Sequence, residues 1–327
     1  MLNFTYLILA FIIGTLIAGK VRWHCTAIGM VNEVNERSSH KKPTVRGGGL
    51  TFPVIMVPFS LTYLYFSDMP SILTSFLVPL TLLSILIAWI GWLDDKKPRT
   101  AKVRLLAQFF SVGICLFFLP TMFADFIPLW VEKTLLFLAW VWFINLYNFL
   151  DGLDGYAAIE GVFICFALLL ISPMLAPFVL VLAGVLLGFL RLNFHPAKVF
   201  MGDVGSTYLG FLLGGFLLLA SSLNPAEIIP IAFLLPALFT FDATYTLIKR
   251  LVGGHKPWEA HKEHWYQRAH TMGLSHRQVF GKGLLINLAI FAFILLGLYL
   301  KIELLAPVCV VILLAGVAIR IRYLEGK

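Results

Sequence analysis

Long apolar blocks alternate with short polar segments along the whole chain. A helix needs roughly 17 to 25 mainly apolar residues to cross a bilayer, and it tolerates an occasional Pro or Gly. The pattern therefore predicts an all-α, polytopic membrane helix bundle. About eleven transmembrane helices are expected, at residues 2–19, 50–66, 72–92, 105–123, 134–150, 156–171, 174–190, 207–223, 228–248, 284–300 and 304–319.

The composition supports this interpretation, because 60% of the residues are hydrophobic and only 13% are charged. A soluble protein carries about 25% charged residues. The first block lacks the basic start of a secretory signal, and its apolar run is long. We expect one membrane domain, 1–327, with polar loops at 20–49, 93–104, 151–155, 191–206 and 249–283.

The positions of the basic residues explain the net charge of +8 as a feature of membrane topology. If the first block runs from outside to inside, 23 of the 25 Lys and Arg fall on the inner side, and only Lys133 and Lys301 do not. This positive-inside asymmetry predicts an external N-terminus and a cytoplasmic C-terminus. It argues against a nucleic-acid partner.

Candidate chemistry falls on the same predicted cytoplasmic side, which holds all eight histidines. A transporter would more naturally place ionisable residues near the bilayer midplane. Asp242 does lie inside a predicted span, where it either pairs with another helix or edges a pocket. The four cysteines form no CxxC pair, so neither a disulfide framework nor a zinc site is indicated.

The stretch IGWLDDKK ends one apolar block with the adjacent carboxylates Asp94 and Asp95. Neighbouring carboxylates repel, which raises the pKa of one of them unless a cation intervenes. A metal or basic partner would let both ionise, or one could act as a base. The alternative is a solvated helix end beside Lys96 and Lys97.

The stretch NLYNFLDGLDG places Asn145, Asn148, Asp151 and Asp154 three residues apart. Residues at this spacing share one side of a helix, and they need partners if they are buried in a membrane. A polar site is one interpretation, and asparagines that join helices are the other. An EF-hand is disfavoured, because its ligand pattern and terminal Glu are missing.

Asp203 lies between glycines in FMGDVGS, just before an apolar block. The N-terminus of a helix attracts phosphate, and a carboxylate beside bound phosphates suits Mg²⁺. A helix cap is the simpler alternative.

Two basic loops complete the set. SSHKKPTVRGGGL combines Lys42 and Arg46 with three glycines, which suits phosphate recognition or simply sets topology. The loop 249–283 carries His261 and His264, which could bind phosphate or a sugar. No Cys or HExxH accompanies them as a zinc site would require, and a solvated loop attracted to anionic lipid is the alternative.

Together these pieces resemble the polyprenyl-phosphate N-acetylhexosamine-1-phosphate transferases, which initiate O-antigen, enterobacterial common antigen and teichoic acid linkage units. A sister branch transfers phospho-MurNAc-pentapeptide in peptidoglycan synthesis. The matching segments are HKKPTVRGGG (40–49), GWLDDKK (91–97), NLYNFLDGLDG (145–155), NFHPAKVFMGDVGS (193–206) and, less closely, GLSHRQ (273–278).

The resemblance implies the reaction of a UDP-N-acetyl-hexosamine with undecaprenyl phosphate at the bacterial inner membrane. It implies Mg²⁺, with Mn²⁺ as a substitute, held by Asp203. It leaves direct attack and a phospho-aspartate mechanism both open, and a homodimer is compatible with it. The implied catalytic residues are Asp94, Asp95, Asp151 and His264. The implied substrate-binding residues are Lys42, Arg46, Asn148, Gly152, Leu153, Asp154, Asn193, Phe200 and His261.

One departure concerns the last loop, where family members often resemble DRxHxHH. Here only His264 matches clearly, while Tyr266 and Gln267 replace two family histidines. This leaves the sugar open and disfavours the peptidoglycan branch. The alternative functions are phospho-MurNAc-pentapeptide transfer and a non-catalytic transporter or lipid-binding protein.

Overall fold

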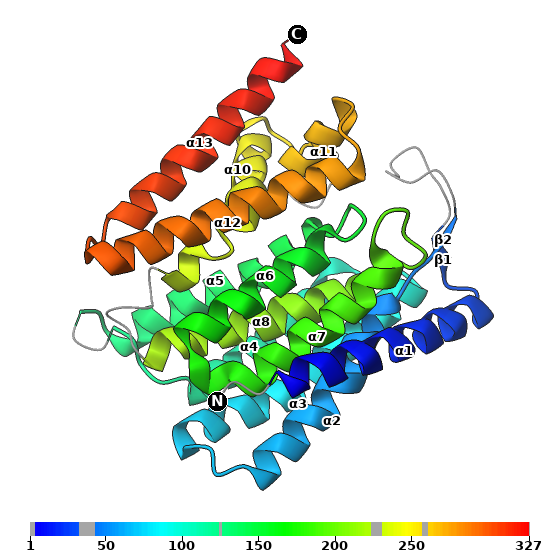
Figure 1. Cartoon of the computed structure of the whole chain (residues 1–327), viewed down its shortest axis with the longest axis vertical. Coiled ribbons are helices and arrows are strands. Elements are labelled where there is room, and N and C mark those ends of the chain that lie inside the picture. Colours follow the sequence, from blue (N-terminus) through cyan, green and yellow to red (C-terminus); the bar gives the residue numbers. More distant parts are fainter. Residues whose placement is uncertain (1–3, 33–42, 124–125, 224–230, 257–260, 327) are drawn as a thin grey trace.

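The structure is a computed structural model that describes residues 4–32, 43–123, 126–223, 231–256 and 261–326. Within these ranges the chain is mostly helical, which confirms the predicted all-α membrane bundle (Figure 1). The helices are α1 (Thr5–Ala27), α2 (Thr51–Phe66), α3 (Ser71–Lys96), α4 (Ala101–Phe118), α5 (Leu129–Phe149), α6 (Tyr156–Ile171), α7 (Ala176–Asn193), α8 (Asp203–Leu223), α10 (Ala237–Val252), α11 (Trp265–Thr271), α12 (His276–Leu300) and α13 (Leu305–Glu325). Short elements are the 3-10 turns η1 (Gly48–Leu50) and η2 (Pro173–Leu175), and an antiparallel pair of strands, β1 (Val31–Asn32) and β2 (Thr44–Val45).

Among the described residues, nine helices are long and apolar enough to cross a membrane. The helices α6 and α10 have 16 residues each. At 1.5 Å per residue each is about 24 Å long, which is shorter than a hydrocarbon core of about 30 Å. The expected span at 228–248 differs most, because α10 begins only after Pro236. Residues 224–230 lie outside the described part.

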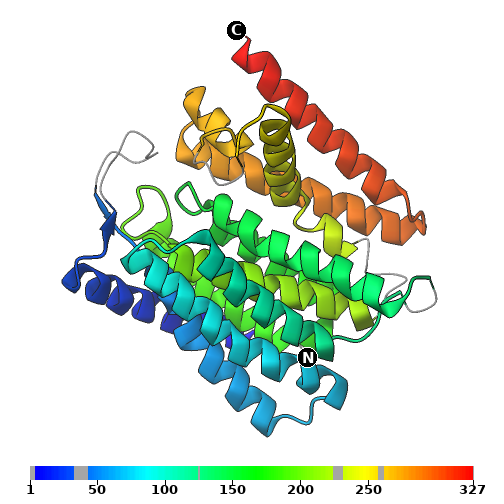
Figure 2. The same ribbon diagram turned by 180° about the vertical axis from the view of Figure 1, so that it is seen from behind.

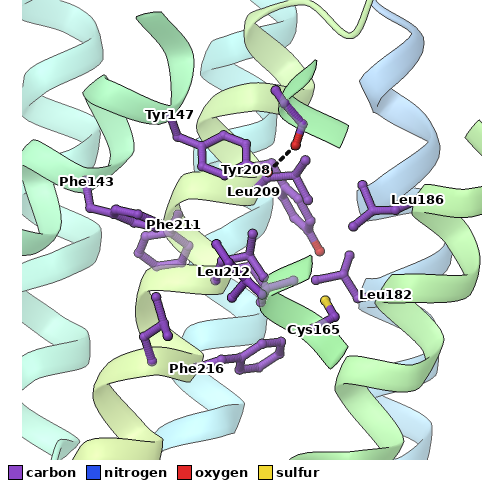
Figure 3. Close-up of a cluster of buried hydrophobic side chains, with 14 of the residues drawn as sticks. Phe143, Tyr147, Cys165, Leu182, Leu186, Tyr208, Leu209, Phe211, Leu212 and Phe216 are labelled. Carbon is purple, nitrogen blue, oxygen red and sulfur yellow. Dashed lines mark hydrogen bonds between the residues drawn. The ribbon is translucent and has the colours of Figure 1, made fainter. Parts of the chain in front are cut away.

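Helix α8 occupies the centre of the bundle, where it packs against α3 and α5. Its whole apolar stretch is buried. Figure 3 shows the cluster around it, in which Phe143 and Tyr147 face Phe211 and neighbouring leucines. The Trp140 Nε1–H group adds a hydrogen bond to the Phe211 carbonyl at 3.0 Å. This packing fixes the position of the first residue of α8, which is Asp203.

Helices α10 to α13 form a group on one side of the bundle, as the two opposite views show (Figures 1 and 2). Helices α12 and α13 pack together, α12 contacts α6, and α10 contacts α5. The buried Glu160 on α6 accepts a short hydrogen bond from the Asn287 side chain on α12. Glu160 lies inside the predicted span 156–171, and it joins two helices.

The predicted motifs meet where α3, α5 and α7 end and α8 begins, a region called the polar end below. The sequence placed Asp94 and Asp95 in a loop beginning at residue 93. In the structure α3 continues to Lys96, so both carboxylates lie in its last helical turns. Helix α1 likewise continues to Ala27, into the segment expected to begin a loop at residue 20.

Candidate active site

The two adjacent carboxylates of α3 have different environments. The Asp95 Oδ1 atom accepts the backbone N–H of Asp203 at 2.9 Å, and Oδ2 accepts that of Val204 at 3.0 Å. These are first-turn N–H groups of α8, which have no partner within their own helix. Asp94 instead accepts the backbone N–H of Arg99 at 2.7 Å. The Asp95 side chain is 0% exposed and that of Asp94 is 9% exposed, so Asp95 anchors α8 while Asp94 is the more accessible acid.

The loop before α8 reaches Asp95 because residue 202 is glycine. A β-carbon at Gly202 would lie 2.5 Å from Asp95 Oδ2, and the φ of +76° also favours glycine. From the sequence we expected the N-terminus of α8 to bind phosphate. The structure corrects this for the N–H groups of Asp203 and Val204, which are already bonded to Asp95.

Two arginines join the carboxylates. Arg46 lies 2.6 Å from Asp95 Oδ1 through Nε and 2.9 Å from Asp203 Oδ1 through Nη2. The Arg104 Nη1 atom lies 3.0 Å from Asp203 Oδ2 and 3.7 Å from Asp94 Oδ2. Burial disfavours the charged guanidinium of Arg46, but Asp95 and Asp203 outweigh it and raise the pKa of Arg46. Asp203 is therefore held between two cations.

The glycine run of the first polar loop serves packing. The N–H groups of Gly48 and Gly49 donate to the carbonyls of Phe200 and Met201, at 2.9 Å and 2.8 Å. A β-carbon at Gly49 would lie 2.2 Å from the Gly205 Cα, so only glycine allows this approach. The loop thereby carries Arg46 to the start of α8. Lys42, the other basic residue expected here, lies outside the described residues.

The polar residues that recur every three positions from Asn145 do not share one role. The Asn145 amide donates to the Gln108 side chain at 2.7 Å, which joins α5 to α4 as the structural alternative predicted. Asn148 accepts the Ser206 hydroxyl at 2.6 Å and so joins α5 to α8. Asp151 follows in the loop. Desolvation, and then the charges of Asp203 and Asp95, raise the pKa of Asp151 well above its usual range, although Arg46 opposes them.

Asp154 belongs to a second polar cluster beside the first. Its Oδ2 atom lies 2.6 Å from His195 Nδ1 and 3.5 Å from His276 Nδ1, and it accepts the Ala197 N–H at 3.1 Å. Asn193 links the same loops, because its amide donates to the Val199 carbonyl and its oxygen accepts the Gly155 N–H.

Other residues that the resemblance implies in substrate binding lie on these same two loops. Leu153 is buried and Phe200 is half-buried. Residue 152 is glycine where the Tyr266 ring approaches, since a β-carbon there would lie 2.1 Å from the Tyr266 hydroxyl. That hydroxyl donates to the Phe149 carbonyl at 3.0 Å, which holds the last polar loop against the DGLDG loop.

The last polar loop carries two histidines whose ring centroids are 4.9 Å apart, His261 and His264. Desolvation, followed by His264 and Arg250, lowers the pKa of His261 to about 4. The buried His264 ring stacks on Phe149 and on Tyr266. Tyr266 therefore contacts both the His264 ring and the DGLDG loop.

Comparisons with known proteins agree with this arrangement. Residues 77–221 match the model of glycosyl transferase family 4. The chain is 31% identical, over 83% of its length and 79% of the relative's, to the "Probable undecaprenyl-phosphate N-acetylglucosaminyl 1-phosphate transferase" of Bacillus subtilis (strain 168). The chain belongs to glycosyl transferase family 4.

Other members are similar at comparable levels. The "Decaprenyl-phosphate N-acetylglucosaminephosphotransferase" of Mycolicibacterium smegmatis is 29% identical over 80% of the chain and 73% of its own length. The "Phospho-N-acetylmuramoyl-pentapeptide-transferase" of Staphylococcus haemolyticus is 29% identical over 71% and 81%. This family 4 protein is thus a multi-pass membrane transferase that moves a sugar-1-phosphate onto a polyprenyl phosphate.

The donor chemistry of the polar end fits the divalent cation that the family implies. Magnesium prefers oxygen ligands and binds one or two carboxylates together with substrate phosphates. The carboxyl groups of Asp94, Asp95 and Asp203 pair with only two arginines, so acidic groups outnumber the cations here. Asp95 fits poorly as a ligand, because both of its oxygens accept backbone N–H groups. Asp203 and Asp151 are the better candidates.

The Asp154 cluster suits magnesium less well. Ligand atoms of Asp154, His195 and His276 lie within 4.8 Å of one another, but two of them are imidazole nitrogens. Imidazole is typical of zinc and other transition metals.

The structure adds residues that sequence reasoning missed. Arg104 lies at the start of an apolar block, in the first turn of α4. A basic residue is disfavoured there by the helix dipole, and this was the one feature of the sequence that could have indicated a role for it. His195 and His276 lie in the matching segments, but nothing in their spacing links them to Asp154.

Proposed function

We propose that this family 4 transferase moves an N-acetylhexosamine-1-phosphate from a UDP-sugar to undecaprenyl phosphate and releases UMP. UDP-N-acetylglucosamine or a close relative is the donor, and the reaction is the first membrane step of O-antigen or another surface polysaccharide. The observation that carries the proposal is the group of Asp94, Asp203, Arg46 and Arg104 at the polar end. The names of the first two relatives support an N-acetylglucosamine donor.

The reaction brings two phosphorylated substrates together, so their mutual repulsion must be reduced. Asp203 with Asp151 would hold Mg²⁺, or Mn²⁺ in its place, and the ion would supply positive charge next to the phosphates. Arg46 and Arg104 add two fixed cations, and their side chains are 30% and 32% exposed, which lets them contact phosphate oxygens. Preorganised charges of this kind stabilise a transferring phosphoryl group.

Asp94 is the proposed base. It takes a proton from the phosphate of the lipid, and an oxygen of that phosphate then forms a bond to the β-phosphorus of the donor. The bond from this phosphorus to the oxygen bridging to the α-phosphorus breaks, and UMP leaves with that oxygen. Asp95 is an unsuitable base because backbone N–H groups occupy both of its oxygens.

The nucleotide is proposed to bind beside the second polar cluster. Leu153, Asp154, Asn193 and Phe200 come from two loops that hydrogen bonds hold together. His195 keeps the Asp154 carboxylate oriented. The site would face the cytoplasm, because 23 of 25 basic residues fall on that side when the spans alternate from an external N-terminus.

The decisive experiment measures UMP release by the purified protein in detergent. UDP-N-acetylglucosamine, undecaprenyl phosphate and Mg²⁺ are supplied together and then omitted one at a time. We expect turnover only with all three, and loss of turnover in Asp203→Asn. Asp68→Asn is the matched control, because Asp68 lies between α2 and α3 at the opposite ends of these helices from the acidic pair.

Other results would change the conclusion. No release from a panel of UDP-sugars by correctly folded protein would overturn the proposal. Turnover only with the pentapeptide-bearing sugar would assign the chain to the peptidoglycan reaction instead. A transporter or lipid-binding protein predicts that Asp203→Asn leaves function unchanged.

A further inference from the structure

The buried carboxylate of Asp242 has no role in the proposed chemistry, yet it faces the last polar loop. It lies on α10, and its residue is 2% exposed. Its Oδ1 atom accepts the Trp265 N–H at 2.8 Å and the Thr246 hydroxyl at 3.2 Å. The same oxygen is 3.5 Å from Nδ1 of His264, which is 4% exposed.

A second contact from α10 holds the same loop. The Arg250 and Lys249 side chains both pair with Glu263, the residue before His264. Asp242 and Arg250 are eight positions apart, about two helical turns, so they lie near one face of α10. One helix face therefore holds the residues on both sides of His264.

The ring of His264 is fixed in the remaining directions. It stacks on Phe149 at 6.4 Å and on Tyr266 at 5.9 Å between centroids. In an imidazole the two nitrogens lie on opposite sides of the ring, so Nδ1 toward Asp242 leaves Nε2 directed away from α10. Phe149 ends α5 two residues before Asp151, which places the ring beside the DGLDG loop.

We infer that Asp242 is a positioning residue for His264. The negative charge of Asp242, 3.5 Å from Nδ1, and its hydrogen bond to the Trp265 N–H hold the ring of His264 in one orientation. Nε2 is then presented toward the site, where it can hold a proton or donate to a diphosphate oxygen of the donor. This inference rests on the proposed function, because it assigns the histidine to that same reaction.

A double-mutant cycle on kcat tests the coupling. Asp242→Asn keeps an acceptor oxygen for Trp265 but removes the charge, and we expect kcat to fall roughly 10- to 100-fold, as when a histidine loses the group that orients it. KM for the UDP-sugar should change less than about twofold. In a His264→Ala background the Asp242→Asn substitution should have no further effect, because a coupled pair is non-additive.

Several controls keep the cycle interpretable. Thr246→Val removes another partner of Asp242 but leaves the histidine contact, so its kcat should stay near that of the parent. If Asp242→Asn does not give a folded protein, the cycle is repeated with Asp242→Glu. In the His264→Ala background, Asp242→Glu should likewise cause no further change in kcat.

Additive losses would overturn the inference, since they would mean that Asp242 acts only by holding α11. A normal kcat in Asp242→Asn would overturn it as well. Absence of turnover in the unsubstituted protein would instead reject the proposed function, so the two failures are distinguishable.

Discussion

Asp94 and Asp95 are adjacent, but the structure predicts that their substitution has different consequences. Replacing Asp95 by Ala leaves the backbone N–H groups of Asp203 and Val204 without partners inside the bundle. A buried unsatisfied donor costs about 1–3 kcal/mol, so the two together cost about 2–6 kcal/mol. Arg46 loses one of its two partners in addition.

This destabilisation is large enough to measure. At about 2 °C per kcal/mol for a chain of this size, Asp95→Ala should lower Tm by about 4–12 °C. Asp95→Asn keeps one acceptor oxygen and should lose roughly half as much. Asp94→Asn replaces the charged acceptor of the Arg99 N–H by a neutral one and loses a weak ion pair with Arg104 at 3.7 Å, which costs about 1 kcal/mol and about 2 °C.

The effects on kcat should distinguish Asp94 from Asp95 in the opposite way from the effects on Tm. Asp94→Asn removes the proposed base and should lower kcat by about 10²- to 10⁴-fold in a protein that melts almost normally. The assay combines Tm from intrinsic tryptophan fluorescence in detergent with UMP release per folded protein. Equal Tm changes for Asp94→Asn and Asp95→Ala would refute the reasoning, and so would a normal kcat in Asp94→Asn.

Three further predictions concern the surrounding residues. Arg104→Ala should lower kcat/KM about 10- to 100-fold, because a charge-assisted contact contributes about 1.5–3 kcal/mol, and Arg104→Lys should lose less in the same UMP assay. Gly152→Ala should lower activity because its β-carbon would lie 2.1 Å from the Tyr266 hydroxyl, and adding Tyr266→Phe should restore part of it. His261 has a pKa of about 4 in the folded protein, below its value near 6.5 when unfolded. The unfolded chain thus binds more protons between pH 4 and 6.5, so Tm should fall as pH falls through this window, and His261→Asn should flatten that dependence.

The helices and the gathering of the motifs could be predicted from sequence, because both follow from simple constraints. A membrane requires long apolar segments, and the positive-inside pattern assigns the intervening loops to sides. The last polar loop was harder to interpret. The sequence indicated that His261 and His264 bind phosphate or a sugar, but nothing in it revealed that Asp242, 22 positions before His264, lies 3.5 Å from its Nδ1 atom.

What could not be predicted depends on tertiary contacts. Successive residues on a helix point in directions about 100° apart, so Asp95 faces α8 while Asp94 faces the loop after α3, although the sequence gives both the same neighbours. The three glycines at 47–49 suggested phosphate binding, because flexible backbone is common to phosphate loops and to close packing. Only the position of Gly205 distinguishes these roles.

The polar end couples folding to catalysis, which affects how mutations in it should be interpreted. The buried charges of Asp95 and Asp203 are tolerated there because they have specific partners, and removing one partner of a buried pair is more costly than the pair is worth. Asp95 holds α8, and α8 begins with Asp203, so a variant at Asp95 displaces the proposed metal ligand without itself touching a substrate. Loss of activity in Asp95 variants therefore does not identify Asp95 as a catalytic acid or base. A lost turnover with an unchanged melting temperature, as expected at Asp94, would.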